Sequence, residues 1–193
     1  MAQIGVMGGT FDPIHIGHLV AASEVHISLQ LDQVLFIPAG QPWQKVGQTI
    51  SPASTRFAMT QLAIADDDRF AISDIEITRD GPSYAIDTLI QLKTENPQDD
   101  FHWIVGADVV QRVSTWHRWE EFVALVPIVV VNRLGIEIGD LSFTYTEVQM
   151  PEVRISASAL RQRYADGKST KYLVPEPVDK YIKDYAMYQQ EQG

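Results

Sequence analysis

Two histidines follow a pair of glycines in the eleven residues GGTFDPIHIGH, Gly8 to His18. Paired glycines let the backbone approach a ligand with its N–H groups free, and Thr10 adds a hydroxyl. If a helix has begun, His15 and His18 lie three residues apart on one face, near its positive end. These residue types at this spacing predict a binding site for an anion such as a phosphate group.

Metal chemistry is the main alternative for these side chains. A zinc site built on His15 and His18 would need further ligands, which the chain does not supply at clear spacing, and the pair also suits an ordinary packed or solvated role. The acidic run 66–68 lacks a second cluster at ligand spacing, so we expect a solvated turn there. The absence of cysteine excludes disulfides and thiolate metal sites. The sequence therefore predicts no resident metal site.

The elements that flank the anion site must position it. An apolar run, Gln3 to Met7, precedes the glycines, an amphipathic run from about Ile16 to Leu29 follows the histidines, and a second apolar run covers Val34 to Ile37. Strand, helix and strand in this order predict a right-handed crossover into a parallel sheet. We therefore expect an α/β fold with a doubly wound parallel sheet, which is Rossmann-like.

The remaining pattern continues the alternation of strands and helices. A long loop from Pro38 to Ser54 is rich in Pro, Gly, Gln and Ser. Ser83 is expected to cap the next helix, and Pro127 to Val131 is apolar throughout and is expected to be central. We expect extended segments at Phe70–Thr78 (two pieces), Phe101–Val105, Pro127–Val131, Phe143–Val148 and Val153–Ile155, a loop at Gly135–Asp140, and helices at about Ala53–Ala65, Tyr84–Thr94, Val109–Val113, Trp116–Leu125, Ser156–Ala165 and Pro177–Tyr188.

Length and composition limit the classes of protein. No repeat or linker interrupts residues 1–193, so we expect a single domain with a small helical part from about residue 156. A net charge of −10 argues against nucleic acid as a partner. The first residues, MAQIGVMGG, lack the features of a signal peptide, and no apolar run is long enough to span a membrane, so we expect a cytoplasmic protein. The sequence leaves open whether the chain forms a homo-oligomer.

Several motifs together resemble a known family. GGTFDPIHIGH resembles the signature of the nucleotidyltransferase superfamily, whose HxGH motif also occurs in class I aminoacyl-tRNA synthetases. The segments PAGQPWQK, GPSYAIDTL, IVGADVV with a tryptophan eight residues past Asp108, and ISASALR resemble those of bacterial nicotinate-nucleotide adenylyltransferases in order and spacing. The similarity covers nearly the whole chain, whereas a second lysine loop of the synthetase type is missing.

The resemblance implies transfer of the AMP part of ATP to nicotinate mononucleotide, which yields deamido-NAD and pyrophosphate with Mg²⁺ present. It implies no covalent intermediate, and it implies that Mg²⁺ is held mainly by the ATP phosphates. The implied catalytic residues are His15, His18 and Arg161. The implied ATP-binding residues are Gly8, Gly9, Thr10, Phe11, His15, His18, Lys45, Asp108, Ser156, Ser158 and Arg161. The implied nicotinate-nucleotide-binding residues are Ser83, Tyr84, Ala85, Asp108 and Trp116.

Other interpretations remain open at this point. By their types alone, Lys45 suits a solvated loop, Arg161 a helix surface and Trp116 a hydrophobic core. The family usually has Thr at the position of Ala85 and often His at that of Gln44, which leaves the preference between the acid and the amide nucleotide open. Two alternative functions are another small-substrate transferase of the phosphopantetheine adenylyltransferase type and a non-catalytic nucleotide-binding regulator.

Overall fold

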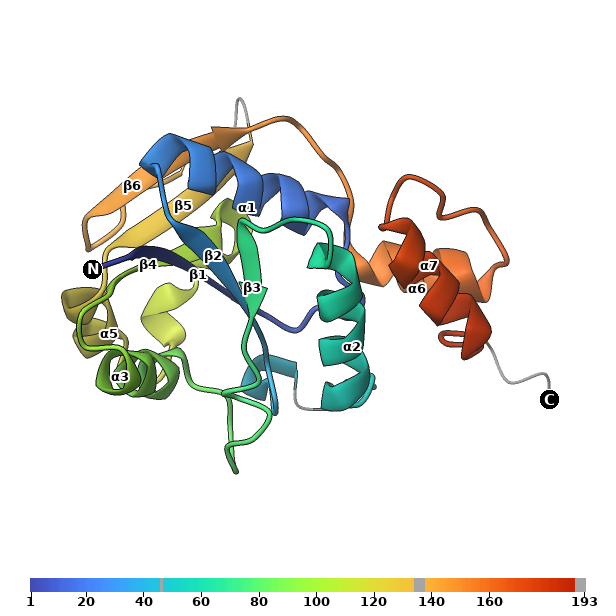
Figure 1. The fold of residues 1–193 in the computed structure, drawn as a ribbon, viewed down its shortest axis with the longest axis horizontal. Coiled ribbons are helices and arrows are strands. Elements are labelled where there is room, and N and C mark those ends of the chain that lie inside the picture. Colours follow the sequence, from blue (N-terminus) through green and yellow to red (C-terminus); the bar gives the residue numbers. More distant parts are fainter. Residues whose placement is uncertain (46, 134–137, 190–193) are drawn as a thin grey trace.

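The computed structural model describes residues 1–45, 47–133 and 138–189, and its centre is a six-stranded sheet (Figure 1). All pairings between neighbouring strands are parallel. The strands are β1 (Gln3–Gly9), β2 (Gln33–Pro38), β3 (Phe70–Ile72), β4 (Asp100–Gly106), β5 (Ile128–Arg133) and β6 (Tyr145–Met150). The predicted α/β fold with a parallel sheet is confirmed.

The strand order places the ends of β1 and β4 side by side. The order is β3-β2-β1-β4-β5-β6, so the sheet grows outward in both directions from β1 and β4. Loops that leave two such central strands diverge to opposite faces and open a crevice at the carboxyl edge of the sheet. The signature glycines close β1, and Gly106 closes β4. The topology therefore brings the two predicted small-residue turns to one place.

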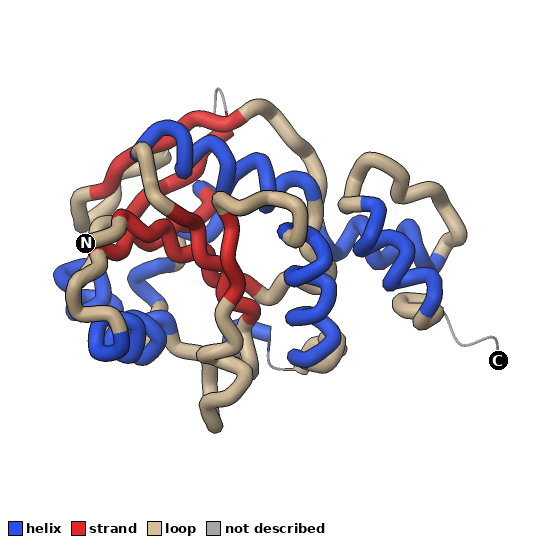
Figure 2. The backbone as a smooth tube through the Cα atoms, viewed as in Figure 1, coloured by secondary structure: helices blue, strands red, loops and turns tan. Residues whose placement is uncertain are grey.

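Helices cover both faces of the sheet (Figure 2). Helix α1 packs into one hydrophobic core, whereas α3 and α5 pack into a second core on the other face. The helices are α1 (Ile16–Leu29), α2 (Ala53–Ile64), α3 (Ala85–Glu95), α4 (Ala107–Val110), α5 (Trp119–Leu125), α6 (Ala157–Ala165) and α7 (Glu176–Asp184), with short 3-10 turns at Trp43–Lys45 and Val113–Thr115.

Strand β5 shows why its sequence is apolar throughout. Val129 and Val131 lie in the first core, and Ile128 and Val130 lie in the second. Side chains alternate between the faces of a strand, so a strand covered on both faces needs apolar residues at every position. The expectation that this strand is central was wrong, because β5 lies between β4 and β6, one strand from the edge of the sheet. Burial on both faces depends on the layers that cover the sheet, and both cores extend over β5 although it is not in the middle of the sheet.

The last two helices lie beside α2, to one side of the sheet (Figure 1). Leu160 of α6 and Val178 and Ile182 of α7 are buried, and they join the first core. That this helical part and the sheet form one domain stays a prediction. No helix in the described ranges combines the length and apolar character that a membrane span requires.

Two expected extended segments are not strands. Residues 70–78 hold only β3, and beyond it the Asp74 carbonyl accepts hydrogen bonds from the N–H groups of Ile77 and Thr78, which closes a turn. The segment 153–155 also lies outside the sheet, and Val153 and Ile155 pack against the first core instead. The expected loop at Gly135–Asp140 falls partly outside the described residues.

The predicted cap of α3 was wrong. Tyr84 occupies the N-cap position, and no side chain caps the helix there. The hydroxyl of Ser83 instead accepts a hydrogen bond from the N–H of Gln41 at 3.1 Å, and the N–H of Ser83 donates to the carbonyl of Gln41 at 2.9 Å. Ser83 thus ties the start of α3 to the loop after β2. The expected helix at Trp116–Leu125 begins only at Trp119, so Trp116 lies in a loop.

Candidate active site

A cavity of ≈ 680 Å³ opens at the carboxyl ends of β1 and β4. Its volume is in the usual range for sites that hold small molecules. It is lined by every residue for which the sequence predicted a site role: Gly8, Gly9, Thr10, Phe11, His15, His18, Lys45, Ser83, Tyr84, Ala85, Asp108, Trp116, Ser156, Ser158 and Arg161. The individual roles of these residues stay predictions.

The two histidines form one stacked unit at the start of α1. His15 is the N-cap residue, and its ring lies 3.8 Å from that of His18, centroid to centroid, with 23° between the planes. The backbone N–H of His15 donates to Nδ1 of His18 at 3.2 Å. Because Nδ1 accepts this bond, the proton of a neutral His18 belongs on Nε2. His18 therefore has an N–H donor for a ligand in the cavity.

The glycine between the histidines is needed for close packing. A Cβ atom on Gly17 would lie 3.1 Å from Nδ1 of His15, which is tighter than ordinary van der Waals contact. A larger residue would therefore push the His15 ring away from its stacked position. This contact gives a steric reason for glycine in the tetrapeptide HIGH.

Burial and charge together keep His18 neutral. Burial lowers the pKa of His18 well below its ordinary value of 6.5, and the neighbouring His15 lowers it further. A neutral ring preserves the Nδ1 acceptor that holds the backbone of His15. At neutral pH the histidine pair thus offers donors without requiring two adjacent positive charges.

The loop between β1 and α1 is held by a buried arginine. Arg56 of α2 is 1% exposed. Its guanidinium donates to the carbonyl oxygens of Thr10 at 2.8 Å, Gly40 at 3.2 Å and Ser51 at 2.9 Å. The loop after β1 and two points of the long loop after β2 therefore meet at one charged group, which fixes the backbone beside the histidines.

The second predicted phosphate segment begins α6. The hydroxyl of Ser156 accepts from the N–H of Ala159 at 3.2 Å, so Ser156 caps the helix that the sequence predicted from this residue. One turn later, Arg161 donates through Nη1 to the carbonyl oxygen of Asp12 at 2.7 Å. This bond links α6 to the signature loop across 149 residues of sequence. The start of α6 and the start of α1 consequently face the same cavity.

The other end of the cavity is aromatic. The ring of Tyr84 stacks on that of His117 at 4.3 Å with 27° between the planes, and it lies 6.0 Å from the ring of Trp43. Trp116 contacts Phe122 of the second core while it lines the cavity. Flat apolar walls of this kind suit a ring such as a pyridine or a purine.

Four charged residues of this site were not predicted from the sequence. Arg112 and Glu76 line the cavity, Arg56 holds the signature loop, and Asp12 holds Arg161. Asp12 lies within the segment GGTFDPIHIGH, so its position in that motif was an available signal, whereas Arg112 lies two residues beyond the segment IVGADVV. Glu76 is 6% exposed, and burial raises the pKa of its carboxyl group. Nothing in the local pattern distinguishes Arg56 from a surface residue of an amphipathic helix.

Comparison with known proteins agrees with this architecture. The cytidylyltransferase-like family model matches residues 6–163. A protein of Corynebacterium kroppenstedtii is 44% identical over 191 residues, which cover 96% of this chain and 90% of that protein. A protein of Streptomyces coelicolor is 43% identical and covers 96% of this chain and 100% of that protein. Both relatives carry the name "Probable nicotinate-nucleotide adenylyltransferase".

The chain belongs to the nicotinate-nucleotide adenylyltransferases of the cytidylyltransferase-like family. A solved structure of nicotinic acid mononucleotide adenylyltransferase from Plasmodium falciparum, complexed with NaAD, superposes with a TM-score of 0.83 over 97% of this chain and 98% of that chain. Its sequence is 19% identical to this chain, so the structural similarity supports the fold alone. The resemblance predicted from the motifs is thus confirmed.

Proposed function

We propose that the chain transfers the adenylyl group of ATP to nicotinate mononucleotide, releasing pyrophosphate and forming deamido-NAD, a step of NAD biosynthesis. One observation carries the proposal: a single cavity joins the histidine pair and Arg161 to the aromatic wall at Trp116. One end suits a triphosphate and the other suits a pyridine ring. The relatives that share over 40% of this sequence carry the same function in their names.

The reaction needs alignment more than proton transfer. The nucleophile is a phosphate oxygen of the mononucleotide, which is already ionised at neutral pH. It attacks the α-phosphorus of ATP in line with the departing pyrophosphate, so one P–O bond forms as the other breaks. Negative charge spreads over the phosphate oxygens as this occurs. Groups that donate hydrogen bonds at fixed positions stabilise that charge without reorganisation.

The histidines and Arg161 are suited to this role. Nε2–H of His18 is free to donate because Nδ1 is already engaged by the His15 backbone. Arg161 approaches from the opposite element, with its guanidinium fixed on the Asp12 carbonyl. We assign His18 to the α-phosphate, and Arg161 with the start of α6 to the β- and γ-phosphates. Lys45, exposed in the loop after β2, lines the same cavity and would add a further cation.

A divalent ion enters this scheme with ATP. Among the described residues, no three His, Asp or Glu side chains gather in a way that could hold a metal ion. The carboxylate of Asp12 already accepts hydrogen bonds from Tyr188 and from the Ser51 backbone. These residues suit an Mg²⁺ ion that the triphosphate itself carries, where it would neutralise phosphate charge.

The pyridine end would distinguish between mononucleotides. Ser83, Tyr84 and Ala85 line the cavity at the start of α3. The N–H groups of Ser83 and Tyr84 are already bonded to backbone carbonyls, so the N–H groups of the first helical turn, from Ala85 onward, are the ones that suit a carboxylate. Trp116 is assigned to stacking on the pyridine ring. Ala85 has no hydroxyl where relatives of this family usually have Thr, so selection of the acid would depend more on backbone donors.

A parallel assay tests the function. Purified protein, ATP and Mg²⁺ are mixed separately with nicotinate mononucleotide, its amide counterpart and phosphopantetheine, and pyrophosphate release is measured. We expect release with nicotinate mononucleotide and slower release with the amide. Release with phosphopantetheine alone would overturn the substrate assignment. No release with any of the three, while ATP still binds, would favour the non-catalytic regulator.

A further inference from the structure

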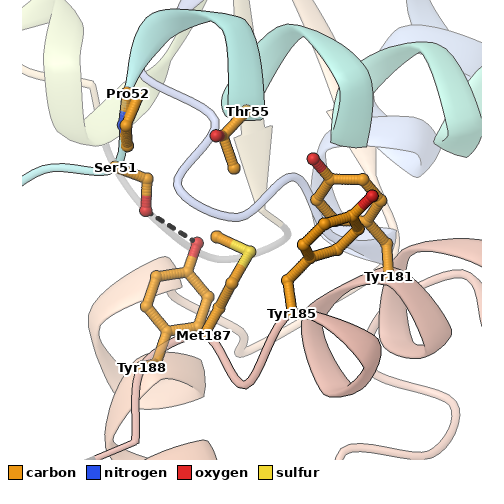
Figure 3. A pocket seen from close by; sticks show the side chains of 7 residues that line it. All are labelled: Ser51, Pro52, Thr55, Tyr181, Tyr185, Met187 and Tyr188. Atoms are coloured by element: carbon orange, nitrogen blue, oxygen red, sulfur yellow. Dashed lines mark hydrogen bonds between the residues drawn. The ribbon is translucent and has the colours of Figure 1, made fainter.

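In the turn that follows α7, the side chain of Tyr188 reaches the loop between β1 and α1. After α7 the backbone turns, and Tyr188 takes a left-handed conformation with φ 61°. Its ring lines a small cavity of ≈ 240 Å³ between α2 and the C-terminal turn (Figure 3). Its hydroxyl donates to Oδ1 of Asp12 at 2.6 Å and accepts from the Ser51 hydroxyl at 3.5 Å. This contact spans 176 residues of sequence.

Asp12 connects Tyr188 to Arg161, at the phosphate end of the cavity. It is 3% exposed, and its second carboxylate oxygen accepts from the Ser51 N–H at 3.1 Å. Its backbone carbonyl accepts from Nη1 of Arg161 at 2.7 Å. The side chain of Asp12 is thus held by Tyr188 and Ser51, and its main chain holds Arg161. A displaced Asp12 would carry the guanidinium of Arg161 with it.

The hydroxyl of Tyr188 keeps its proton and therefore remains a hydrogen-bond donor to Asp12. Burial raises the pKa of Tyr188, and the hydrogen bond to Asp12 raises it further, so the phenol stays protonated across the physiological range. A buried carboxylate requires such a partner, because an ion removed from water is costly unless hydrogen bonds replace its hydration. The neighbouring Tyr185 differs, since it is 68% exposed and its hydroxyl forms no hydrogen bond with any residue of the described ranges.

We propose that Tyr188 is a positioning residue for the adenylyl transfer, which sets the guanidinium of Arg161 toward the phosphates by fixing Asp12. The proposal rests on the proposed function for its kinetic consequences. Tyr188 touches neither ATP nor the mononucleotide in this scheme. Its effect passes through Asp12 to Arg161.

Removal of one hydroxyl tests the proposal. Tyr188→Phe keeps the ring contacts, including that with Tyr164, and deletes the donor to Asp12 together with the longer contact from the Ser51 hydroxyl. We expect kcat to fall about tenfold, as for loss of one hydrogen bond to a charged group, with the KM for nicotinate mononucleotide unchanged. Tyr185→Phe, in the same turn, is the matched control and should keep the wild-type kcat. A wild-type kcat in Tyr188→Phe would overturn the proposal.

A double-mutant cycle separates positioning from a general loss of structure. Arg161→Lys removes the Nη1 bond to Asp12, so in that background Tyr188→Phe should lower kcat by less than about twofold. If Tyr188→Phe lowers kcat by the same factor in both backgrounds, Tyr188 does not act through Arg161 and the proposal fails. Thermal unfolding of all four proteins shows whether a change in kcat merely follows a change in stability.

Binding of inorganic pyrophosphate distinguishes this proposal from the proposed function. Calorimetry on the full chain should give an affinity about fivefold weaker in Tyr188→Phe than in the wild type. If the wild type fails to adenylylate nicotinate mononucleotide but Tyr188→Phe still weakens pyrophosphate binding, the function fails and the positioning role stands. If the wild type is active and Tyr188→Phe changes neither kcat nor pyrophosphate affinity, the positioning role alone fails.

Discussion

The two ends of the cavity are built in different ways. At the phosphate end, Asp12, His15 and Arg56 are 3%, 6% and 1% exposed, and several hydrogen bonds hold the first and last of them. At the pyridine end, His117 is exposed and Tyr84 is half-buried, and the two contact each other through stacked rings. We infer that the two ends have different roles. The buried, hydrogen-bonded end is rigid and would position donors for the transition state, whereas the more exposed end is adaptable and would bind the ring.

The largest expected effect is loss of the donor at the rigid end. His18→Asn retains an acceptor near the position of Nδ1 and removes the Nε2 donor. We expect kcat to fall about 10²–10³-fold, with little change in the KM for nicotinate mononucleotide. His117→Asn is the matched variant at the other end, and its effect should appear mainly in that KM. Equal losses of kcat in the two variants would contradict this difference in roles.

Loss of the buried arginine should weaken the rigid end itself. Arg56→Met leaves three loop carbonyls without their common donor, so the free energy of unfolding should fall by about 3 kcal/mol, measured by urea denaturation. Arg69→Met is the control, because Arg69 pairs with Asp67 at the surface and should cost less than about 1 kcal/mol. Equal costs would show that the rigid end does not depend on Arg56.

Loss of the aromatic wall should affect binding more than turnover. Trp116→Ala should raise the KM for nicotinate mononucleotide about tenfold, which corresponds to the loss of one aromatic stacking contact, and should change kcat less. Trp116→Phe keeps a ring and should lose less affinity. A fall in kcat as large as that in His18→Asn would place Trp116 at the reacting centre instead.

The smallest expected effect is a pH dependence of stability. The pKa of His18 is lowered in the folded protein, mainly by burial, so the unfolded chain binds the proton first as the pH falls below the ordinary value of 6.5. Folding stability should therefore decrease in this range and be fully present above it. His18→Asn lacks this group, so the wild type should lose more stability than the variant between pH 7.5 and 5.5. Parallel urea titrations that show equal losses would contradict the lowered pKa of His18.

Local patterns were informative where the interaction itself is local. The amphipathic run after the histidines predicted α1, and the segment Ser156–Ala165 predicted α6, whose N-cap is Ser156. Ser83 precedes a helical run in the same way, yet its hydroxyl bonds the N–H of Gln41, 42 residues away. A serine hydroxyl that could cap a helix accepts a hydrogen bond from whichever N–H lies within reach. Here the loop after β2 supplies that N–H, and the sequence near Ser83 does not reveal it.

The alternation of strands and helices, the glycine turn between β1 and α1 and many of the residues around the cavity could be predicted from the sequence, because apolar periodicity and short motifs are encoded within a few neighbouring positions. How that turn is held could not be predicted, because it depends on contacts between distant segments. The bonds of Tyr188 and Arg161 to Asp12 join residues 176 and 149 positions apart. The hydrogen-bond partners of a buried charged group depend on which loops lie next to it, and the packing of the whole chain determines which loops those are.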